Sequence, residues 1–427
     1  RGTTLGAATF GRSRNPTPFQ PDDLVLAEEL AAHAAVCIDN ARRFTHEHAA
    51  ALALQRSLLP MDLLAQNAVE AAYRYLPADA EAGVGGDWFD VLPLSGARVA
   101  LVVGDVVGHG LRAAATMGRL RAAVQTLADI DLGPDEVLAH LDDMVGRIAL
   151  ETADSSGVIG ATCLYAVYDP VTRHCTLARA GHPAPVLVTP NGGARLVDLP
   201  SGPPLGLGGL PFEATCLDLP EGSVLALYTD GLIHSPALDT DQGLQHLADA
   251  LATPGIPLEE LCEAAVTGLS DGRPADDVAL LLARTGALGE EHVACWEIPK
   301  DPAAVASARA KAAQQLAVWG LEELTFTTEL VVSELVTNAV RYGSDPVQLR
   351  LIRDRTLICE VSDGSSTSPH MRHARTTDEG GRGLFLIAQV AERWGARYGR
   401  GGKTVWSEQP LRPAATGRDG PDGKAAR

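Results

Sequence analysis

The sequence predicts an α+β protein with more than one domain. Its 427 residues exceed what a single hydrophobic core usually organises, so two or three domains are expected. From Ala71 to Arg284, apolar runs of strand length are separated by Gly, Pro and Asp, and helical patterns intervene near 111–128, 134–150 and 258–268. Because helices and strands do not alternate one by one, the pattern favours paired sheets over a parallel βαβ sheet.

The N-terminal part predicts one long helix. Residues 3–10 have the pattern of a short strand, and a helical pattern without Gly or Pro then continues from Asp22 to Leu59, until Pro60 stops it. At 1.5 Å per residue this helix would be ~57 Å long. It either lies on a domain surface or pairs with a second chain, and apolar residues at seven-residue intervals favour a homodimer through the helix 22–59. These residues are Leu24, Ala31, Ile38, Leu52 and Leu59, with Thr45 as the polar exception.

A smaller α/β unit is expected after a linker near residues 286–292. Its predicted elements are, in order, helices near 302–318 and 323–341, strands near 347–352 and 356–362, a helix at 383–394 and a last strand at 402–406. The tail 413–427 is rich in Gly, Pro and charged residues, which predicts disorder.

Composition and charge disfavour several classes of protein. The net charge is −19, with the acid excess in the first two thirds and no basic patch, so nucleic-acid binding is not expected. No apolar stretch approaches the ~20 residues that span a bilayer, and the first residues, which have no signal-peptide core, indicate a chain that begins inside a domain. The seven cysteines occur singly, without a CxxC pair, which predicts reduced thiols in the cytoplasm.

Four apolar runs carry an aspartate at one edge. Asp87 lies in VGGDWFD, Asp105 ends ALVVGD, Asp230 ends ALYTD and Asp276 begins DDVALLL. Each one alone is typical of a turn at the end of a strand. Together, ionised carboxylates at the inner ends of buried strands repel one another unless cations neutralise them, and hard oxygen ligands suit Mg²⁺ or Mn²⁺. Two such ions ~4 Å apart can activate a bridging water and screen phosphoryl oxygens.

Seven motifs in order carry a resemblance to a known family. They are LQRSLLP (54–60), GGDWFD (85–90), GDVVGHG (104–110), AGHPAPVL (180–187), GPPLG (202–206), YTDGL (228–232) and ADDVALL (275–281). These segments resemble the sporulation-E-type phosphatases, which belong to the metal-dependent, type-2C (PPM) serine/threonine phosphatases. The resemblance implies an α-β-β-α sandwich that removes phosphate from a protein serine or threonine.

The resemblance also implies roles for the matching residues. The ligands of two Mn²⁺ or Mg²⁺ ions would be Asp87, Asp105, the Val106 carbonyl, Asp230 and Asp276. Asp105 would bridge the two ions, and Asp276 could exchange roles with its neighbour Asp277. Gly108 and Gly110 are expected in turns around the site.

A second set of residues lies in the C-terminal third. Glu334 and Asn338 are four residues apart, so they face the same way on a predicted helix, and the apolar residues around them indicate that the helix is partly buried rather than a solvated polar face. Asp363 follows the strand LICEV. EGGRGLFLI then places glycines before a helix, where backbone N–H groups can approach a phosphate; these are Gly380, Gly381 and Gly383.

This ordered trio resembles the GHKL (histidine-kinase-like) ATPases, specifically the anti-sigma-factor serine kinases. The resemblance implies a two-layer α/β sandwich that binds ATP with Mg²⁺. Asn338 would coordinate the Mg²⁺, Glu334 would be the general base on a substrate hydroxyl, and Asp363 would bind the adenine amino group. Gly381 and Gly383 would lie in the lid beside the phosphates. VSDGSS departs from the wider family pattern because it lacks a second glycine.

The expected organisation follows from these resemblances. Residues 1–46 resemble the end of a GAF sensor domain with a signalling helix, 47–287 the phosphatase, 288–412 the GHKL ATPase or kinase, and 413–427 form the tail. The expected function is reversible phosphorylation of a STAS-like anti-sigma-factor antagonist, with control of a sigma factor, itself a possible partner, by partner switching. The alternative is a phosphatase whose C-terminal domain only binds a sigma factor or antagonist. A scaffold with two inactive sites is disfavoured by the intact aspartates.

Overall fold

The structure is a computed structural model of the chain. It describes residues 5–11, 13, 17–58, 60, 67–78, 85–151, 160–234, 239–253, 255–269, 274, 276–366, 383–399 and 401–411, with only the backbone for 47–58. Among these residues, no helix is both long and apolar enough to cross a bilayer.

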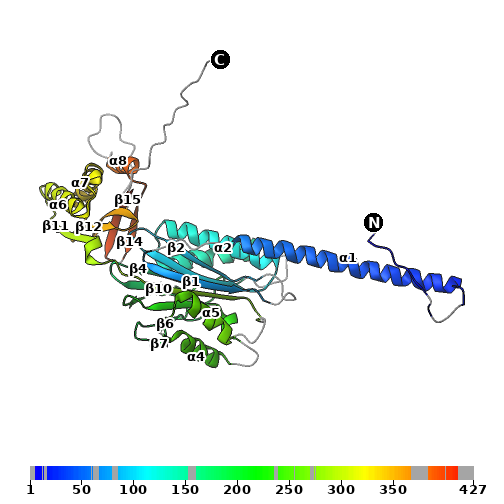
Figure 1. The fold of residues 1–427 in the computed structure, drawn as a ribbon. Coiled ribbons are helices and arrows are strands. Elements are labelled where there is room, and N and C mark those ends of the chain that lie inside the picture. Colours follow the sequence, from blue (N-terminus) through cyan, green and yellow to red (C-terminus); the bar gives the residue numbers. More distant parts are fainter. Residues whose placement is uncertain are drawn as a thin grey trace, which may run out of the picture.

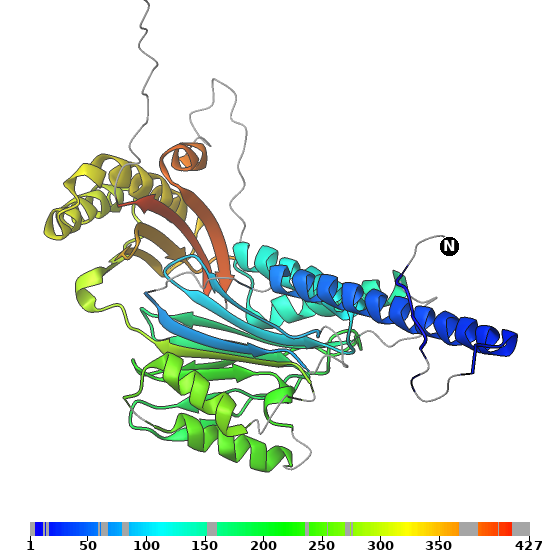
Figure 2. The same ribbon diagram turned by 45° about the vertical axis from the view of Figure 1, so that its right-hand side comes forward.

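The first element is the long helix that the sequence predicts. α1 (Pro21–Leu58) contains 38 residues, and its N-terminal half projects away from the rest of the molecule (Figures 1 and 2). Leu59 and the tail 413–427 lie outside the described residues. The strand expected at 3–10 is wrong over the described residues 5–10, which form no strand, because a strand needs a neighbour with which to pair. Exposed apolar side chains on α1 are Leu24, Val25, Leu26, Leu30, Val36, Ile38 and Phe44.

Two antiparallel sheets form the middle of the chain. One has the order β1 (Val69–Leu76), β10 (Val278–Thr285), β9 (Val224–Tyr228), β6 (Val186–Val188) and β7 (Ala194–Leu196). The other has the order β2 (Trp88–Pro93), β3 (Val99–Val106), β4 (Ala161–Asp169), β5 (His174–Ala180) and β8 (Thr215–Asp218). Their facing sides share one apolar core, to which Phe89, Leu164 and Leu281 contribute.

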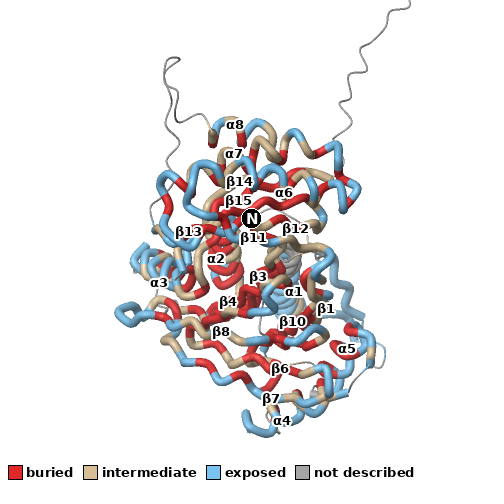
Figure 3. The backbone as a smooth tube through the Cα atoms, turned by 90° about the vertical axis from the view of Figure 1, so that its left-hand side faces the viewer, coloured by how far each residue is buried: buried red, intermediate tan, exposed pale blue. Residues whose placement is uncertain are grey.

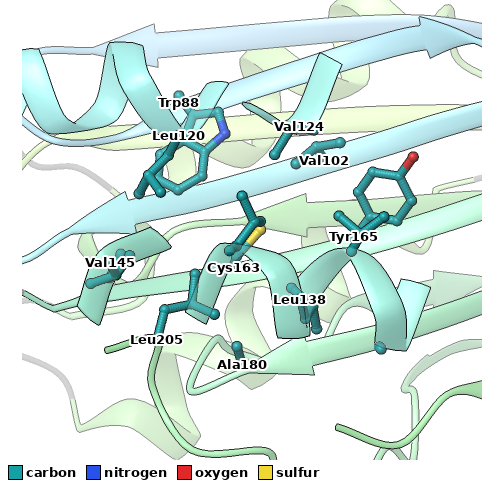
Figure 4. Packing of buried hydrophobic residues seen from close by; sticks show 14 of the residues in the cluster. Trp88, Val102, Leu120, Val124, Leu138, Val145, Cys163, Tyr165, Ala180 and Leu205 are labelled. Carbon is teal, nitrogen blue, oxygen red and sulfur yellow. The ribbon is translucent and has the colours of Figure 1, made fainter. Parts of the chain in front are cut away.

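Helices cover the outer faces of both sheets. α2 (Leu111–Asp129) and α3 (Pro134–Glu151) pack on the β2–β3–β4–β5–β8 sheet, where Trp88, Leu120 and Tyr165 are buried (Figure 4). α4 (Thr240–Leu251) and α5 (Leu258–Leu269) cover the other sheet. Buried stretches follow the strands and the inner sides of these helices (Figure 3). The predicted α-β-β-α sandwich is therefore confirmed.

The C-terminal part is the predicted two-layer α/β sandwich. Its antiparallel sheet has the order β11 (Val293–Ile298), β12 (Val347–Arg353), β13 (Thr356–Asp363), β15 (Gly402–Pro410) and β14 (Arg393–Gly399). The helices α6 (Ala304–Trp319), α7 (Thr325–Tyr342) and α8 (Gly383–Val390) share a core with one face of this sheet. Short 3₁₀ turns precede β11 (Glu290–His292) and α7 (Glu322–Leu324).

Two expectations for this part are corrected by the structure. The helix predicted at 383–394 ends at Val390, and the following residues form β14, which pairs with β15. A Cβ added at Gly395 would lie 2.7 Å from the Trp406 ring, so the strand pairing depends on a glycine under an aromatic side chain on the adjacent strand. β11 was not expected; it is an edge strand of its sheet, directly after the predicted linker, and its residues are only moderately buried.

The two sandwiches meet through the β2–β3 turn. Arg397 of β14 donates a hydrogen bond from Nη1 to Ser95 Oγ (3.2 Å). Gly96, with φ 71°, lies against Glu360 of β13, because a Cβ added there would be 2.4 Å from Glu360 Oε1. At the domain junction, Asn67 also donates a hydrogen bond to Asp354. The hairpin that begins beside Asp87 thus contacts the C-terminal sheet at its opposite end.

Candidate metal and nucleotide sites

Asp87 and Asp105 meet at one end of the β2–β3 pair. Asp87 directly precedes β2, and Asp105 lies near the end of β3; because Trp88 pairs with Gly104, the antiparallel register brings the two aspartates together. Asp87 is 3% exposed and shares a side-chain hydrogen bond with Asp105. Its Oδ2 is buried without a hydrogen-bond partner among the described residues. A buried oxygen with no partner is costly unless a cation occupies the site.

Val106 lies beside the same aspartate. Its backbone N–H donates to the Gly86 carbonyl (3.3 Å), and a Cβ added at Gly86 would lie 2.4 Å from the Val106 carbonyl oxygen. Only glycine therefore allows the chain before Asp87 to approach the end of β3 so closely. The turn that follows contains Gly108 and Gly110, whose φ values of 99° and 88° agree with the turn predicted there.

Asp230 and Asp276 come from the other sheet. Asp230 follows the end of β9 and starts a 3₁₀ turn (Asp230–Leu232), and Asp276 precedes β10, which pairs with β9. The Asp230 side chain is about half exposed and Asp276 is exposed. A Cβ added at Gly231 would lie 2.1 Å from the Asp277 carbonyl oxygen, so this glycine permits the two loops to pack together.

The adjacent Asp276 and Asp277 have different environments. Asp277 is buried, and its carboxylate accepts hydrogen bonds from the Tyr75 hydroxyl and from the Ala78 backbone N–H (2.7 Å). Asp276 faces solvent and accepts a hydrogen bond from the backbone N–H of Asp277 (2.8 Å). The carboxylate of Asp277 is thus used in hydrogen bonds to β1 and the chain just after it, whereas Asp276 keeps an oxygen available to a ligand.

The pKa values of Asp87 and Asp105 are those expected of carboxylates whose charges are not balanced by a cation. Burial, followed by the charge of Asp105, raises the pKa of Asp87 well above its usual value. Burial also raises the pKa of Asp105 to about 6; the hydrogen bond with Asp87 opposes this shift, and the charges of Asp230, Asp276 and Asp277 add to it. Mutual repulsion among acids is relieved by a bound cation.

The residues present fit divalent cations of the Mg²⁺ or Mn²⁺ type. The donor set consists of carboxylate oxygens and a backbone carbonyl, which these hard ions prefer. Within the part of the chain that the structure describes, no three His, Cys, Asp or Glu side chains already enclose one point. Among the proposed aspartate ligands, Asp87 is the most buried.

Several residues at this site were not found from the sequence. Thr229 is fully buried, forms a side-chain hydrogen bond with Asp87, and accepts one from the Ala279 backbone N–H (2.9 Å). Tyr75 on β1, 202 residues earlier in the chain, donates a hydrogen bond to the Asp277 carboxylate. The paired glycines before Asp87 were the one local signal of close packing at the site.

The nucleotide-site residues also gather on one side of α7. Glu334 and Asn338 are half-buried on α7, and a Cβ added at Gly383 would lie 2.2 Å from Glu334 Oε2. At the end of α7, a Cβ added at Gly343 would lie 2.6 Å from Asp363 Cγ. The two glycines therefore allow the start of α8 and the end of β13 to approach the same helix. Gly380 and Gly381 lie outside the described residues.

Asp363 is compensated, unlike the aspartates of the first site. Its carboxylate accepts hydrogen bonds from the backbone N–H groups of Ser365 (2.9 Å) and Ser344 (3.3 Å). Lys403 of β15 lies 3.4 Å from Asp363 Oδ2 and donates a hydrogen bond to Ser365 Oγ (2.7 Å). An adenine amino group would therefore share Asp363 with a lysine.

Comparison with known proteins adds two family matches. Residues 95–286 match the family described as Stage II sporulation protein E (SpoIIE), and residues 298–407 match the Histidine kinase-like ATPase domain. The phosphoserine phosphatase RsbP of Bacillus subtilis (strain 168) is 27% identical over 210 residues, which cover 48% of this chain and 50% of RsbP. The chain thus spans about half the length of this curated relative.

Solved structures resemble parts of the chain. The RsbU and RsbW domains of Rv1364c from Mycobacterium tuberculosis are 27% identical, with 83% of this chain and 96% of that chain covered and a TM-score of 0.49. The SiaA-PP2C domain of Pseudomonas aeruginosa is 21% identical, with 58% and 98% covered and a TM-score of 0.46.

Proposed function

Since the chain carries a SpoIIE-type phosphatase domain followed by a histidine kinase-like ATPase domain, we propose that it is a metal-dependent serine/threonine phosphoprotein phosphatase. The observation that carries the proposal is the gathering of aspartates from both sheets at one edge of the sandwich, with a buried Asp87 oxygen that has no partner. The match to RsbP, a phosphoserine phosphatase, supports the same activity.

In this proposal the residues of the chain would bind the metal ions and keep the ligands in position. Two Mn²⁺ or Mg²⁺ ions would be held by Asp87, Asp105, the Val106 carbonyl, Asp230 and Asp276. When bound, such ions lower the pKa of a coordinated water and screen phosphoryl oxygens. Asp105 would be the shared ligand, as the family resemblance implies, and the influence of both Asp87 and the aspartates of the other sheet on its pKa supports that role. The half-exposed Asp230 and the exposed Asp276 would leave the site open to a phosphate carried on another protein.

The direct test is hydrolysis of p-nitrophenyl phosphate by the full chain. We expect turnover with Mn²⁺ or Mg²⁺, loss of turnover after EDTA treatment, and recovery when the metal is added back. The same hydrolysis rate in EDTA would contradict the metal assignment. No hydrolysis under any metal condition, with phosphorylated protein substrates also unchanged, would contradict the phosphatase assignment.

The proposed substrate is a phosphorylated, STAS-like anti-sigma-factor antagonist. The resemblance to the sporulation-E-type phosphatases supports it, and dephosphorylation of the antagonist would control a sigma factor by partner switching in the cytoplasm. Candidate phosphorylated antagonists are incubated with the full chain, with and without Mn²⁺, and the phosphate is followed by mass spectrometry. If no antagonist loses its phosphate while p-nitrophenyl phosphate is hydrolysed, the substrate class is wrong but the activity stands.

For the C-terminal domain we propose ATP·Mg²⁺ binding and serine kinase activity. Asn338 would coordinate the Mg²⁺, Glu334 would accept the proton of the substrate hydroxyl, and Asp363 would bind adenine, with Gly381 and Gly383 beside the phosphates. The close approach of Gly383 to Glu334 supports this arrangement. Calorimetry should detect ATP·Mg²⁺ binding that Asn338→Ala removes and that a change at the exposed Phe326 on the same helix retains.

The alternative is a C-terminal domain that binds a sigma factor or antagonist without phosphorylating it. The pairing of Asp363 with Lys403 favours this alternative in one respect, because it occupies the carboxylate proposed for adenine. Phosphate transfer from ATP to a purified antagonist separates the two functions. If the transfer occurs, we expect the kinase to phosphorylate the same residue that the phosphatase domain dephosphorylates.

A homodimer through α1 is proposed from its exposed apolar residues. Side chains such as Leu24 and Ile38 lie on a helix that projects beyond the two sandwiches (Figure 2), and a second copy would cover them. Light scattering should report a dimer that Leu24→Glu with Ile38→Glu dissociates, whereas His33→Glu retains it. A monomer at high protein concentration would contradict the proposal. The GAF-like nature of residues 1–46 stays a prediction, and α1 continues through the boundary at residue 46.

A further inference from the structure

His182 is a buried histidine with both ring nitrogens engaged. It lies between β5 and β6 and is 2% exposed. Its Nε2 is 3.0 Å from the Tyr228 carbonyl oxygen, and its Nδ1 is 2.8 Å from Thr162 Oγ1. A carbonyl can only accept, so Nε2 carries the proton, and Nδ1 therefore accepts from the Thr162 hydroxyl. Burial lowers the pKa of His182 to about 3, which agrees with a neutral ring that accepts at one nitrogen and donates at the other.

The two partners belong to different sheets and lie next to different metal-site aspartates. Thr162 is on β4, directly opposite Asp105 in the β3–β4 pair. Tyr228 is the last residue of β9, two positions before Asp230. The histidine therefore joins the strand beside one aspartate to the strand end that leads to the other.

A role in the core alone would not require these partners. The core between the two sheets is apolar, and apolar contacts are not directional. Besides the His182 bonds, polar links between the sheets include Thr229 with Asp87 at this edge and the Tyr168 hydroxyl with the Gly286 carbonyl (2.7 Å) at the far end of β4. Hydrogen bonds are directional and short, so one donor and one acceptor on a rigid ring set the separation of the two strands at this edge. Mg²⁺ needs ligands at about 2.0–2.1 Å in near-ideal geometry, so a small slide of one sheet would separate aspartates that must share an ion.

We propose that His182 is a positioning residue for the metal site. His182 keeps the strand beside Asp105 at a set distance from the segment that carries Asp230. Aspartates from both sheets can then bind the same pair of ions. This inference rests on the proposed metal-dependent phosphatase function. It assigns no contact between His182 and the ions or the substrate.

The first test removes one hydrogen bond without changing the shape of the side chain. Thr162→Val is nearly isosteric, and in the full chain we expect it to weaken Mn²⁺ binding, measured by calorimetry, by about 10-fold, as changes behind metal ligands commonly do. The EDTA-treated protein should remain folded, with a melting temperature lower by a few degrees at most, since one buried acceptor loses its donor. Thr176→Val is the matched control. Thr176 is also half-buried, but it lies on β5, opposite Cys216 of β8. It should leave Mn²⁺ affinity unchanged.

The second test uses graded changes at the histidine. Gln can place an amide N–H near the position of Nε2 and keep the bond to Tyr228, whereas Ala keeps neither bond. We expect Mn²⁺ affinity to decrease from wild type to His182→Gln to His182→Ala. Wild-type affinity in both Thr162→Val and His182→Gln would overturn the positioning role and leave the metal site intact. Absence of Mn²⁺ binding by the wild-type chain would overturn the metal site itself, and the positioning role with it.

Discussion

Asp87 and Glu360 are buried to almost the same extent, at 3% and 1% exposure, yet their surroundings are opposite. Asp87 lies beside other acids, and its pKa is raised well above the usual value by burial and then by the charge of Asp105. Glu360 lies where the two sandwiches meet, with Arg397 2.6 Å from Oε1 and Arg350 2.5 Å from Oε2. Burial raises the pKa of Glu360, but the two arginines outweigh it and lower the pKa to about 2.

The compensated cluster continues across the domain interface. Arg397 also donates to Ser95 Oγ, and Arg98 donates to the Ser95 carbonyl (3.0 Å) and to Asp131 (2.7 Å). Where a buried carboxylate serves the structure, this chain supplies the cation from its own side chains. Where several carboxylates lie together without one, protonation or a cation from solution neutralises them, and the proposed metal site uses a cation. This contrast distinguishes a structural cluster from a binding site.

The largest expected effect is at the uncompensated cluster. Asp105→Asn should lower Mn²⁺-dependent turnover of p-nitrophenyl phosphate by at least about 10³-fold, or ~4 kcal/mol in the barrier, because the proposed site would lose the carboxylate that both ions would share. The metal-free protein should remain folded by circular dichroism, since the change removes a repulsive charge. Asp218→Asn, exposed on β8 of the same sheet, is the control and should keep full activity. Near-normal turnover of Asp105→Asn would contradict the assignment.

The compensated cluster should respond in stability rather than in metal binding. Glu360→Gln leaves Arg350 and Arg397 buried without their shared carboxylate, and should lower the free energy of unfolding of the C-terminal domain by about 3 kcal/mol. Urea unfolding followed by Trp fluorescence measures the change. Glu408→Gln, which removes a looser pair with Arg393 (3.7 Å), should cost clearly less. Equal effects of the two substitutions would show that the double pairing adds nothing.

Asp276 and Asp277 allow the same contrast between adjacent residues. Asp276→Asn should weaken Mn²⁺ affinity, by up to about 100-fold, with little change in stability. Asp277→Asn should instead lower the free energy of unfolding by about 1–3 kcal/mol, because it disturbs the buried hydrogen bonds with Tyr75 and Ala78. Calorimetry with Mn²⁺ and urea unfolding measure the two quantities. The reverse pattern would exchange the roles of the two aspartates.

The smallest effect is a pH dependence with a definite sign. The folded-state pKa of Glu360, about 2, lies below its usual value of 4.5. Its contribution to stability is therefore complete above pH 4.5 and is lost as the pH falls toward 2. The difference in unfolding free energy between wild type and Glu360→Gln should shrink as the pH is lowered from 5.5 to about 3.5. A difference that stays constant over this range would mean that the carboxylate is not the group responsible.

Local patterns predicted part of the architecture. Strand and helix periods and breakers depend on residues close together in the chain, so α1 and an α+β pattern with paired sheets could be predicted from them. The α-β-β-α sandwich and the two-layer C-terminal unit were instead implied by the resemblance of the ordered motifs to known families. α4 was missed although Asp239 and Gln242 form a capping box at its start, because Gly243 interrupts the apolar pattern. The predicted helix 383–394 extended into the first two residues of β14, Arg393 and Trp394, and the rest of β14 was not predicted, because its pairing with β15 decides the outcome.

The sequence by itself determined which carboxylates lie at strand ends, and it left open an exchange of roles between Asp276, the assigned ligand, and Asp277. Only the tertiary structure separated them, because Tyr75, which engages Asp277, lies 202 residues earlier in the chain. The same holds for the bonds of His182 to Thr162 and Tyr228, and for Lys403 beside Asp363. Backbone periodicity is a local property of the chain. The partner of a buried polar group depends on which distant strands the core brings together, and that partner decides whether a carboxylate is structural or available to a ligand.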